Sequence, residues 1–314
     1  MIAVGIDVGG TSIKGATIKD NGEVLDRFSM PVDKSLSPEV LVGELCELVN
    51  KTLSEHHYEE KVVGIGIGIP GSFNNETGVI TNCVNLPTWK GFHLKEFIES
   101  KCHLYTKLVN DADAAALAEA KFGAGKDYNY VLMLTLGTGV GGGIVINKNL
   151  VNGYLGMGAE LGHMIIEVDG RPCNCGRKGC FEQYASATAL IRETKKAIEE
   201  HPSSLLKEIA NHLGVVDARV PFIAEKKGDK CAKEIVDQYV KYLSEGILNY
   251  CNIFRPNIVV LSGGVANEGE NLFSRVREYL KKFDYGMPNM PEVKIAASSV
   301  GYDSGKIGAA ALYF

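Results

Sequence analysis

The chain has 314 residues, 45% of them hydrophobic, with 33 Lys and Arg against 38 Asp and Glu and a formal net charge of -5. This is the composition of a folded globular protein, and its mild acidity argues against a nucleic-acid partner, which would favour a basic face. No run reaches the ~18 apolar residues of a membrane span, and the N-terminal sequence shows no signal-peptide pattern. We therefore expect a cytoplasmic protein that does not associate with a membrane.

The first predicted element is a strand that ends in the glycine turn of residues 7–11, Asp-Val-Gly-Gly-Thr, and leads into a second strand. The same pattern recurs at residues 136–143, Leu-Gly-Thr-Gly-Val-Gly-Gly-Gly. Two ordinary hairpins would explain the strands, but they do not need so many glycines. Since glycine lets a backbone approach a ligand closely, we interpret both turns as phosphate-binding loops, with N–H groups and the hydroxyls of Thr11 and Thr138 as donors.

Two better-known phosphate motifs are excluded. The glycines at 137–142 formally satisfy G-x-G-x-x-G, but a strand-like sequence follows them, whereas the dinucleotide fingerprint opens a helix. The P-loop pattern G-x-x-x-x-G-K-[ST] is absent from the sequence.

Between the turns, the pattern predicts an amphipathic helix that starts at Ser37 and Pro38 and a strand over residues 62–71. An alanine-rich helix should begin at Asn110 and Asp111 and stop at Gly123. From residue 186 to 254 the sequence is mostly helical. The rest of the chain is predicted to contain a strand that leads into the glycines at 263–264, a helix over 271–283, a short strand over 293–297 and a final helix. The order indicates an α/β protein of two similar halves, with a hinge near 110–130.

Two aspartates at strand ends are candidates for chemistry. Asp7 precedes the first glycine turn, where a carboxylate beside phosphate needs a cation between them, so it is either a Mg²⁺ ligand or a cap of its own turn. Asp111 lies at a strand-to-helix junction, where it is either a helix N-cap or a general base. The residues alone leave both alternatives open.

Three of the eight cysteines lie within eight residues, at Cys173, Cys175 and Cys180, and His163 precedes them by ten. Three thiols and an imidazole on a loop with turn glycines form the Cys₃His set of a closed, structural Zn²⁺ site. A redox pair or surface thiols are the alternatives. Glu160 and Glu182 flank the cluster, which could orient both carboxylates toward a polar ligand.

Together, these motifs resemble the ROK family of sugar kinases (repressors, open reading frames, kinases), in the actin, Hsp70 and hexokinase superfamily. The resemblance covers nearly the whole chain. It is carried by the two glycine turns, by Leu-Ser-Gly-Gly-Val-Ala at 261–266, and by E-x-G-H at 160–163 with C-x-C-G-x-x-G-C-x-E at 173–182. The sequence that begins at Glu182 is similar to bacterial glucokinases in particular.

The resemblance implies two ribonuclease H-like lobes, each a mixed sheet flanked by helices, with a cleft between them. A small lobe over residues 1–112 would be completed by a C-terminal helix at 302–314. A large lobe over 113–301 would carry the zinc loop and a helical subregion.

The activity implied is phosphorylation of a hexose at O6 by ATP and Mg²⁺, with glucose as the expected sugar and a homodimer or homotetramer as the expected assembly. The first alternative is a kinase of N-acetylmannosamine or N-acetylglucosamine. The second belongs to a different class, a sugar-sensing regulator without catalysis. Such a regulator would need a helix-turn-helix, for which the sequence leaves no room before Asp7.

The family roles transfer by motif, with Asp111 as the catalytic base. The residues that would bind the sugar are Gly71, Asn85, Asn110, Asp111, Glu160, His163 and Glu182. Those that would bind the nucleotide and its metal are Asp7, Gly9, Gly10, Thr11, Ser12, Lys14, Gly137, Thr138, Gly139, Gly141, Gly263 and Gly264.

Overall fold

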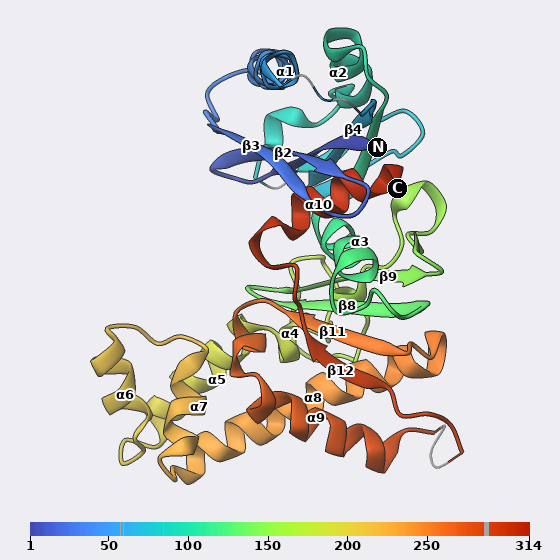
Figure 1. The fold of residues 1–314 in the computed structure, drawn as a ribbon. Helices are drawn as coiled ribbons and strands as arrows, with labels where there is room; N and C mark the ends of the chain where they lie inside the picture. The colour runs from blue at the N-terminus through green and yellow to red at the C-terminus, as the bar shows by residue number, and fades with distance from the viewer. Residues whose placement is uncertain (57, 59, 84, 286–288) are drawn as a thin grey trace. The chain divides into compact units, whose positions relative to one another are not determined.

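The computed structural model describes residues 1–56, 58, 60–83, 85–285 and 289–314. The chain divides into two compact units (Figure 1). The first comprises Met1–Asn129, Gly143–Ala159 and Ser299–Phe314, and the second comprises Tyr130–Gly142 and Glu160–Ser298.

The first unit is built on a five-stranded sheet of order β3-β2-β1-β4-β7. Strands β1, β2 and β3 form an antiparallel meander, and β4 and β7 continue the sheet parallel to β1. Their bounds are β1 Ile2–Val8, β2 Ser12–Lys19, β3 Val24–Pro31, β4 Val62–Ile69 and β7 Thr106–Asn110. A separate two-stranded sheet pairs β5 Gly71–Phe73 with β6 Ile80–Cys83.

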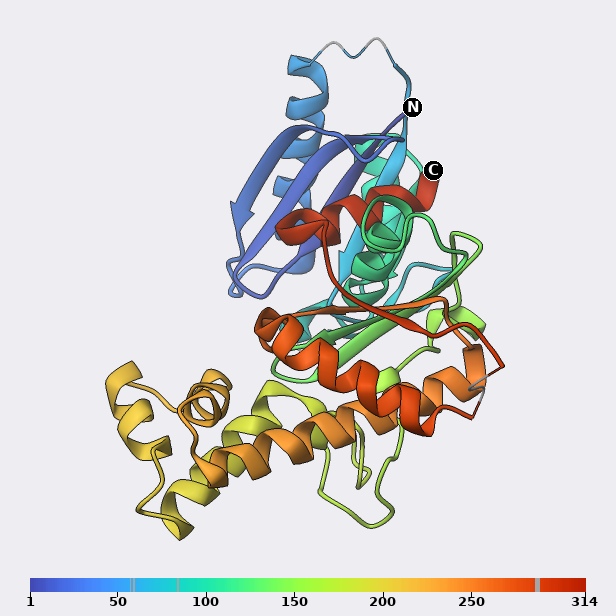
Figure 2. The same ribbon diagram turned by 60° about the horizontal axis from the view of Figure 1, so that its bottom comes forward.

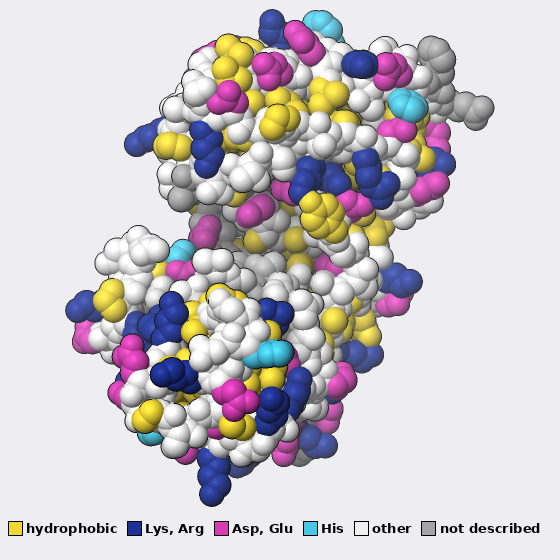
Figure 3. Space-filling model, turned by 90° about the vertical axis from the view of Figure 1, so that its left-hand side faces the viewer, with side chains coloured by type: hydrophobic (Ala, Val, Ile, Leu, Met, Phe, Trp, Pro, Cys, Tyr) yellow, Lys and Arg dark blue, Asp and Glu magenta, His cyan; other side chains and the backbone are white. Residues whose placement is uncertain are grey.

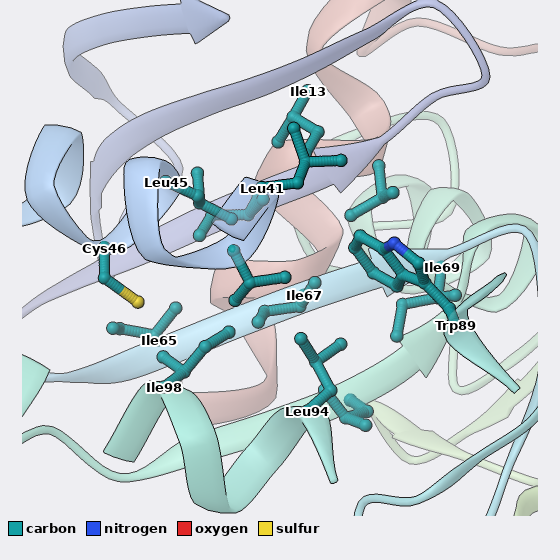
Figure 4. Close-up of a cluster of buried hydrophobic side chains, with 14 of the residues drawn as sticks. Ile13, Leu41, Leu45, Cys46, Ile65, Ile67, Ile69, Trp89, Leu94 and Ile98 are labelled. Carbon is teal, nitrogen blue, oxygen red and sulfur yellow. The ribbon is translucent and has the colours of Figure 1, made fainter. Parts of the chain in front are cut away.

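Helices cover both faces of this sheet (Figures 1 and 2). One face packs against α1 Pro38–Glu55 and α2 Leu94–Cys102, the other against α3 Asp111–Phe122 and α10 Ser304–Ala310. The alternation of side chains along β1 explains the two layers. Val4, Ile6 and Val8 enter the α1–α2 core, drawn in Figure 4, whereas Ala3 faces α10.

The second unit contains most of a sheet of order β10-β9-β8-β11-β12, in which β11 is parallel to β8 and β12. The strands are β8 Tyr130–Leu136, β9 Val140–Ile146, β10 Asn149–Leu150, β11 Ile258–Ser262 and β12 Lys294–Ala297. Both large sheets therefore consist of three strands consecutive in the chain followed by two added strands. This confirms the predicted mixed α/β fold of two similar halves.

The helices of the second unit include the 25-residue α8 Lys230–Phe254 and α9 Glu270–Phe283. The predicted helical subregion is formed by α5 Ala187–Glu200, α6 Leu206–Leu213, α7 Arg219–Lys226 and the start of α8, around a small core of their own. Short helices complete the described elements: α4 Glu182–Ala185, η1 Pro87–Trp89, η2 Tyr154–Gly156, η3 Leu161–His163, η4 Gly264–Glu268, η5 Gly301–Asp303 and η6 Ala311–Tyr313.

The helix starts agree with the sequence. Ser37 caps α1 by accepting a hydrogen bond from the Val40 N–H, with Pro38 in the first turn. The first unit extends further than the predicted lobe of residues 1–112, because α3 packs tightly against α10: a Cβ on Gly308 would lie 1.7 Å from the Ala114 carbonyl oxygen.

Acidic and basic side chains are interspersed over the visible face of each unit (Figure 3), as the nearly balanced charge predicts. Within the described part of the chain, no helix combines the length and the apolar character needed to cross a membrane.

Candidate active site and metal centre

Parallel strands bring three of the predicted site residues to one edge of the first sheet. In the strand register, Asp7 pairs with Gly68, and Ile69 pairs with Asn110. The carboxyl ends of β1, β4 and β7 therefore lie together, and in α/β sheets this edge is where ligands bind. Gly71 follows β4 at the same edge.

The first glycine turn connects β1 to β2 in a tight hairpin. The Gly9 N–H donates to the Ser12 carbonyl at 3.0 Å. A Cβ on Gly10 would lie 3.1 Å from the side chain of Asn85. A predicted sugar residue, Asn85, thus packs against the predicted phosphate turn.

Asp7 lies at the start of this turn, and burial raises the pKa of its carboxyl group, while Lys14 and Lys306 act to lower it. A Cβ on Gly305 would lie 3.0 Å from the carboxyl carbon of Asp7, so a larger residue there would have to displace the Asp7 side chain by a few tenths of an ångström. The carboxylate can ligate Mg²⁺, and the two ammonium groups and the N–H groups of the glycine turn can attract a phosphate, so the set suits a Mg²⁺–phosphate ligand.

Sequence reasoning missed Lys306, which is only 5% exposed and forms an ion pair with Asp303 at 2.5 Å. Lys14, which was predicted, hydrogen-bonds to the hydroxyl group of Tyr302. The sequence gives no signal for these contacts because they depend on the return of the C-terminal segment to the first unit.

The junction of β7 and α3 assigns separate roles to the two residues found there. The Asn110 side chain accepts a hydrogen bond from the Ala112 N–H at 2.9 Å and donates to the Gly71 carbonyl at 3.4 Å. Asn110 is therefore the N-cap of α3, and the N-cap alternative for Asp111 is wrong.

Asp111 is exposed in the first turn of α3, and its carboxylate also accepts from the Ala112 N–H at 2.9 Å. Burial raises the pKa of the Cys83 thiol, and the charge of Asp111 adds to this effect. Cys83 pairs with Gly71 across the small sheet. Asp111 is thus a carboxylate near Cys83, at the same edge of the sheet as Gly71.

The second glycine turn lies between β8 and β9 and packs against the residues at 182–188. The Ala187 N–H donates to the Gly137 carbonyl at 2.8 Å, and the Thr188 hydroxyl donates to the Thr138 carbonyl at 2.7 Å. A Cβ on Gly139 would lie 2.5 Å from a carboxylate oxygen of Glu182.

Gly263 and Gly264, which the family resemblance assigns to nucleotide binding, directly follow β11. Gly263 has a φ of +87°, and a Cβ there would lie 2.6 Å from the Leu136 carbonyl oxygen, so glycine is required on both counts. Gly264 begins η4. Gly141 lies within β9.

The four predicted metal ligands come together. One ligand atom each from His163, Cys173, Cys175 and Cys180 lies within 4.8 Å of all the others. The sulfurs of Cys175 and Cys180 are 3.6 Å apart, and the Cys173 sulfur is 3.6 Å from His163 Nδ1. A tetrahedral Zn²⁺ with ordinary bond lengths requires about 3.8 Å between sulfurs and about 3.6 Å from sulfur to nitrogen. The donor set therefore fits zinc.

Turn glycines shape the loop that carries the cysteines. The Cys173 N–H donates to the Arg177 carbonyl at 2.9 Å. Gly179 has a φ of +79°, and a Cβ there would lie 1.6 Å from the Glu167 carbonyl oxygen. All eight cysteines of the chain carry free thiols.

Glu182 is shared between the metal loop and the second glycine turn. One carboxylate oxygen accepts from the Cys173 thiol at 3.0 Å and lies 3.8 Å from His163 Nδ1, and the other faces Gly139. Glu160 immediately precedes η3, whose last residue is His163. The second unit thus gathers three predicted sugar residues around the metal cluster.

The chain is similar to known proteins over nearly its whole length. The family model described as ROK family matches residues 3–314. Glucokinase of Halalkalibacterium halodurans is 37% identical over 97% of this chain and 92% of its own length, and glucokinase of Thermotoga maritima is 36% identical over 98% and 96%. The xylose repressor of Bacillus subtilis is 27% identical over 98% of this chain and 75% of its own length.

Among solved structures, the ROK hexokinase of Thermus thermophilus has a TM-score of 0.83 at 31% identity, over 99% of this chain and 97% of that one. A ROK family glucokinase of Streptomyces griseus, solved in complex with glucose and AMPPNP, has a TM-score of 0.76 at 31% identity, over 99% of both chains. By its sequence and its fold, this chain belongs to the ROK family.

Proposed function

We propose that the protein is an ATP-dependent hexokinase of glucose, which transfers the γ-phosphoryl group to the sugar O6. The observation that carries the proposal is full-length similarity to glucokinases, one of them solved with glucose and AMPPNP. This chain has a carboxylate, that of Asp111, at the start of α3.

Asp111 is the proposed base for the O6 proton. Phosphoryl transfer needs positioning and charge stabilisation more than covalent chemistry, and a carboxylate near the acceptor hydroxyl supplies the positioning. Asn110 both caps α3 and holds the Gly71 backbone, so it fixes the geometry around Asp111. The remaining proposed sugar residues are Asn85 in the first unit and Glu160, His163 and Glu182 in the second.

The glycine turns, at residues 9–12 and 137–139, are the proposed phosphate sites, with Gly263 and Gly264 at the nucleoside. Asp7 and the phosphates would hold Mg²⁺, which would supply positive charge to the transferred group. Lys14 and Lys306 supply further positive charge beside Asp7.

One structural Zn²⁺ is proposed for His163, Cys173, Cys175 and Cys180. Four protein ligands leave no open coordination position, so the ion orders the loop and does not act on the substrate. Support comes from the 3.6 Å spacings within the cluster.

A coupled assay tests the proposal. Glucose, mannose, N-acetylglucosamine, N-acetylmannosamine and allose are compared as acceptors with ATP as donor, and polyphosphate is tried as a second donor with glucose. The highest kcat/KM is expected for glucose with ATP. A higher kcat/KM for either N-acetylhexosamine would make that sugar the substrate in place of glucose. If no sugar is phosphorylated, the regulator class is favoured. The xylose repressors of that class are 27–29% identical to this chain. Light scattering tests the expected homodimer or homotetramer.

A further inference from the structure

The start of α5 is held against the second glycine turn by two hydrogen bonds to consecutive carbonyl groups. The Ala187 N–H donates to the Gly137 carbonyl at 2.8 Å, and the Thr188 hydroxyl donates to the Thr138 carbonyl at 2.7 Å. The start of the helix is itself fixed, because the Ser186 side chain caps it by accepting from the Ala189 N–H at 3.1 Å.

Because peptide units are planar, these two contacts also determine the direction in which two N–H groups of the turn point. In a trans peptide unit, the carbonyl and the N–H of the next residue lie in one plane and point in opposite directions. A Gly137 carbonyl turned toward α5 therefore directs the Thr138 N–H away from α5. In the same way, a Thr138 carbonyl that points toward α5 directs the Gly139 N–H away from α5.

Two successive N–H groups that point to one side form a concavity that attracts anions. If the peptide between Thr138 and Gly139 turned over, it would present a carbonyl oxygen there and repel a phosphate. Of the two contacts that prevent this, only the one from Thr188 is made by a side chain, so it can be removed by substitution.

We propose that Thr188 is a positioning residue for the nucleotide phosphates, which it serves by holding the peptide between Thr138 and Gly139. The inference rests on the proposed function, since it takes ATP as the ligand of this turn. Thr188 is exposed, so its hydroxyl group is not needed to fill the core.

The test compares four proteins: wild type, Thr188→Val, Thr188→Ser and Thr194→Val. Valine removes the hydroxyl and keeps the shape, whereas serine keeps the donor. Thr194 is the matched control, because it lies on the same helix and its hydroxyl donates within that helix, to the Leu190 carbonyl at 2.8 Å. The readouts are the affinity for a non-hydrolysable ATP analogue, the KM for ATP, kcat, glucose affinity without nucleotide, and the melting temperature.

Thr188→Val should weaken analogue binding and raise the KM for ATP by about 3- to 10-fold, the value of one hydrogen bond. Its kcat should fall, and its glucose affinity should stay within about twofold, because the lost bond touches only the phosphate turn. Thr188→Ser should restore the wild-type values, and Thr194→Val should resemble wild type in nucleotide affinity.

Unchanged analogue affinity in Thr188→Val, or an equal loss in Thr194→Val, would overturn the role of Thr188. So would an equal fall in glucose affinity, since that would indicate general damage. If Thr188→Val does not fold, Thr188→Ala is measured in its place against the same criteria. A wild-type protein that neither binds the analogue nor phosphorylates a sugar would instead overturn the proposed function.

Discussion

Asn110 and Asp111 are neighbours at the start of α3, but only Asn110 caps the helix. Asn and Asp are equally good N-caps, so the pair Asn110-Asp111 predicts a helix start without saying which residue caps it. The backbone decides, because Asn110 has the extended φ and ψ of a cap, -65° and 147°, whereas Asp111 already lies in the helix. From the sequence alone, Asp111 could therefore be predicted only as either a helix N-cap or a general base.

The first prediction tests Asp111 as the base. Asp111→Asn should lower kcat by about 10²- to 10⁴-fold, because a positioned general base contributes that much, with ATP-analogue affinity nearly unchanged. Glu39→Gln is the matched control, since Glu39 is also an acidic residue in the first turn of a helix. Steady-state kinetics and calorimetry provide the readouts. A kcat within about threefold of wild type would be too small a loss for a removed base.

The two turn glycines differ in their surroundings, although the sequence gives them the same pattern. A Cβ on Gly139 would collide with Glu182, while a Cβ on Gly137 would meet no atom within 4 Å among the described residues beyond its two chain neighbours. The Gly139–Glu182 contact joins residues 43 positions apart, so no local pattern predicts it.

A second prediction follows from this contrast. Gly137→Ala should raise the KM for ATP and leave the KM for glucose within about twofold, because only a closely bound phosphate is there to be displaced. Gly139→Ala should raise both, because the new methyl group displaces Glu182, a proposed sugar residue. Initial-rate kinetics with each substrate varied in turn decide the matter. Equal KM values for ATP in Gly137→Ala and wild type would remove the support for a phosphate site at this turn.

At the scale of elements, the sequence predicts helix ends and loops that depend on neighbouring residues. It does not predict the contacts between segments that are distant in the chain. The Ser-Pro start of α1 and the Gly123 stop of α3 depend only on neighbouring residues, and both are confirmed. The cysteine spacing likewise predicted the loop of residues 173–180. His163 reaches the loop because Ile165 forms an isolated bridge with Cys180. The further link from this loop through Glu182 to the second glycine turn is tertiary, and the sequence does not contain it.

The third prediction concerns this loop as a unit. Metal analysis should find about one Zn²⁺ per chain, and Cys175→Ser should lose most of it while the KM for glucose rises at least about tenfold. The reason is that Glu182 follows the proposed ligand Cys180 by two residues and begins α4, so the ordered loop fixes the position of its carboxylate. Cys231→Ser is the control, since Cys231 is a free, half-buried cysteine outside the cluster. Zinc-free protein with a normal KM for glucose would show that the loop does not order the sugar site.

At the scale of the whole molecule, the repeated glycine turn predicted two similar halves, and the structure shows two five-stranded sheets of corresponding strand order. The repeated turn does not predict how closely the C-terminal helix packs against the N-terminal strands. The last helix, α10, lies directly on backbone atoms of the first unit, where side chains would not fit. A Cβ on Gly5 would lie 1.9 Å from the Lys306 carbonyl oxygen, and a Cβ on Gly66 would lie 1.8 Å from that of Ala309. Glycines in β1 and β4, which the sequence predicts only as strand residues, thus allow α10 to pack this closely on the first sheet.

The last prediction tests this closure. Gly66→Ala should destabilise the first unit by about 3 kcal/mol, because the methyl group meets backbone that cannot move aside without displacing α10. Gly43→Ala is the matched control. Gly43 lies inside α1, and among the described residues no atom outside its own stretch of helix lies within 4 Å of the position its Cβ would take, so alanine there should stabilise by about 0.5–1 kcal/mol. Trp89 is the only tryptophan of the chain and is buried in the core of the first unit, so its fluorescence during urea denaturation reports on that unit (Figure 4). If Gly66→Ala and wild type unfold at the same urea concentration, α10 does not rest on β4, and the C-terminal segment would not be required to complete the first unit.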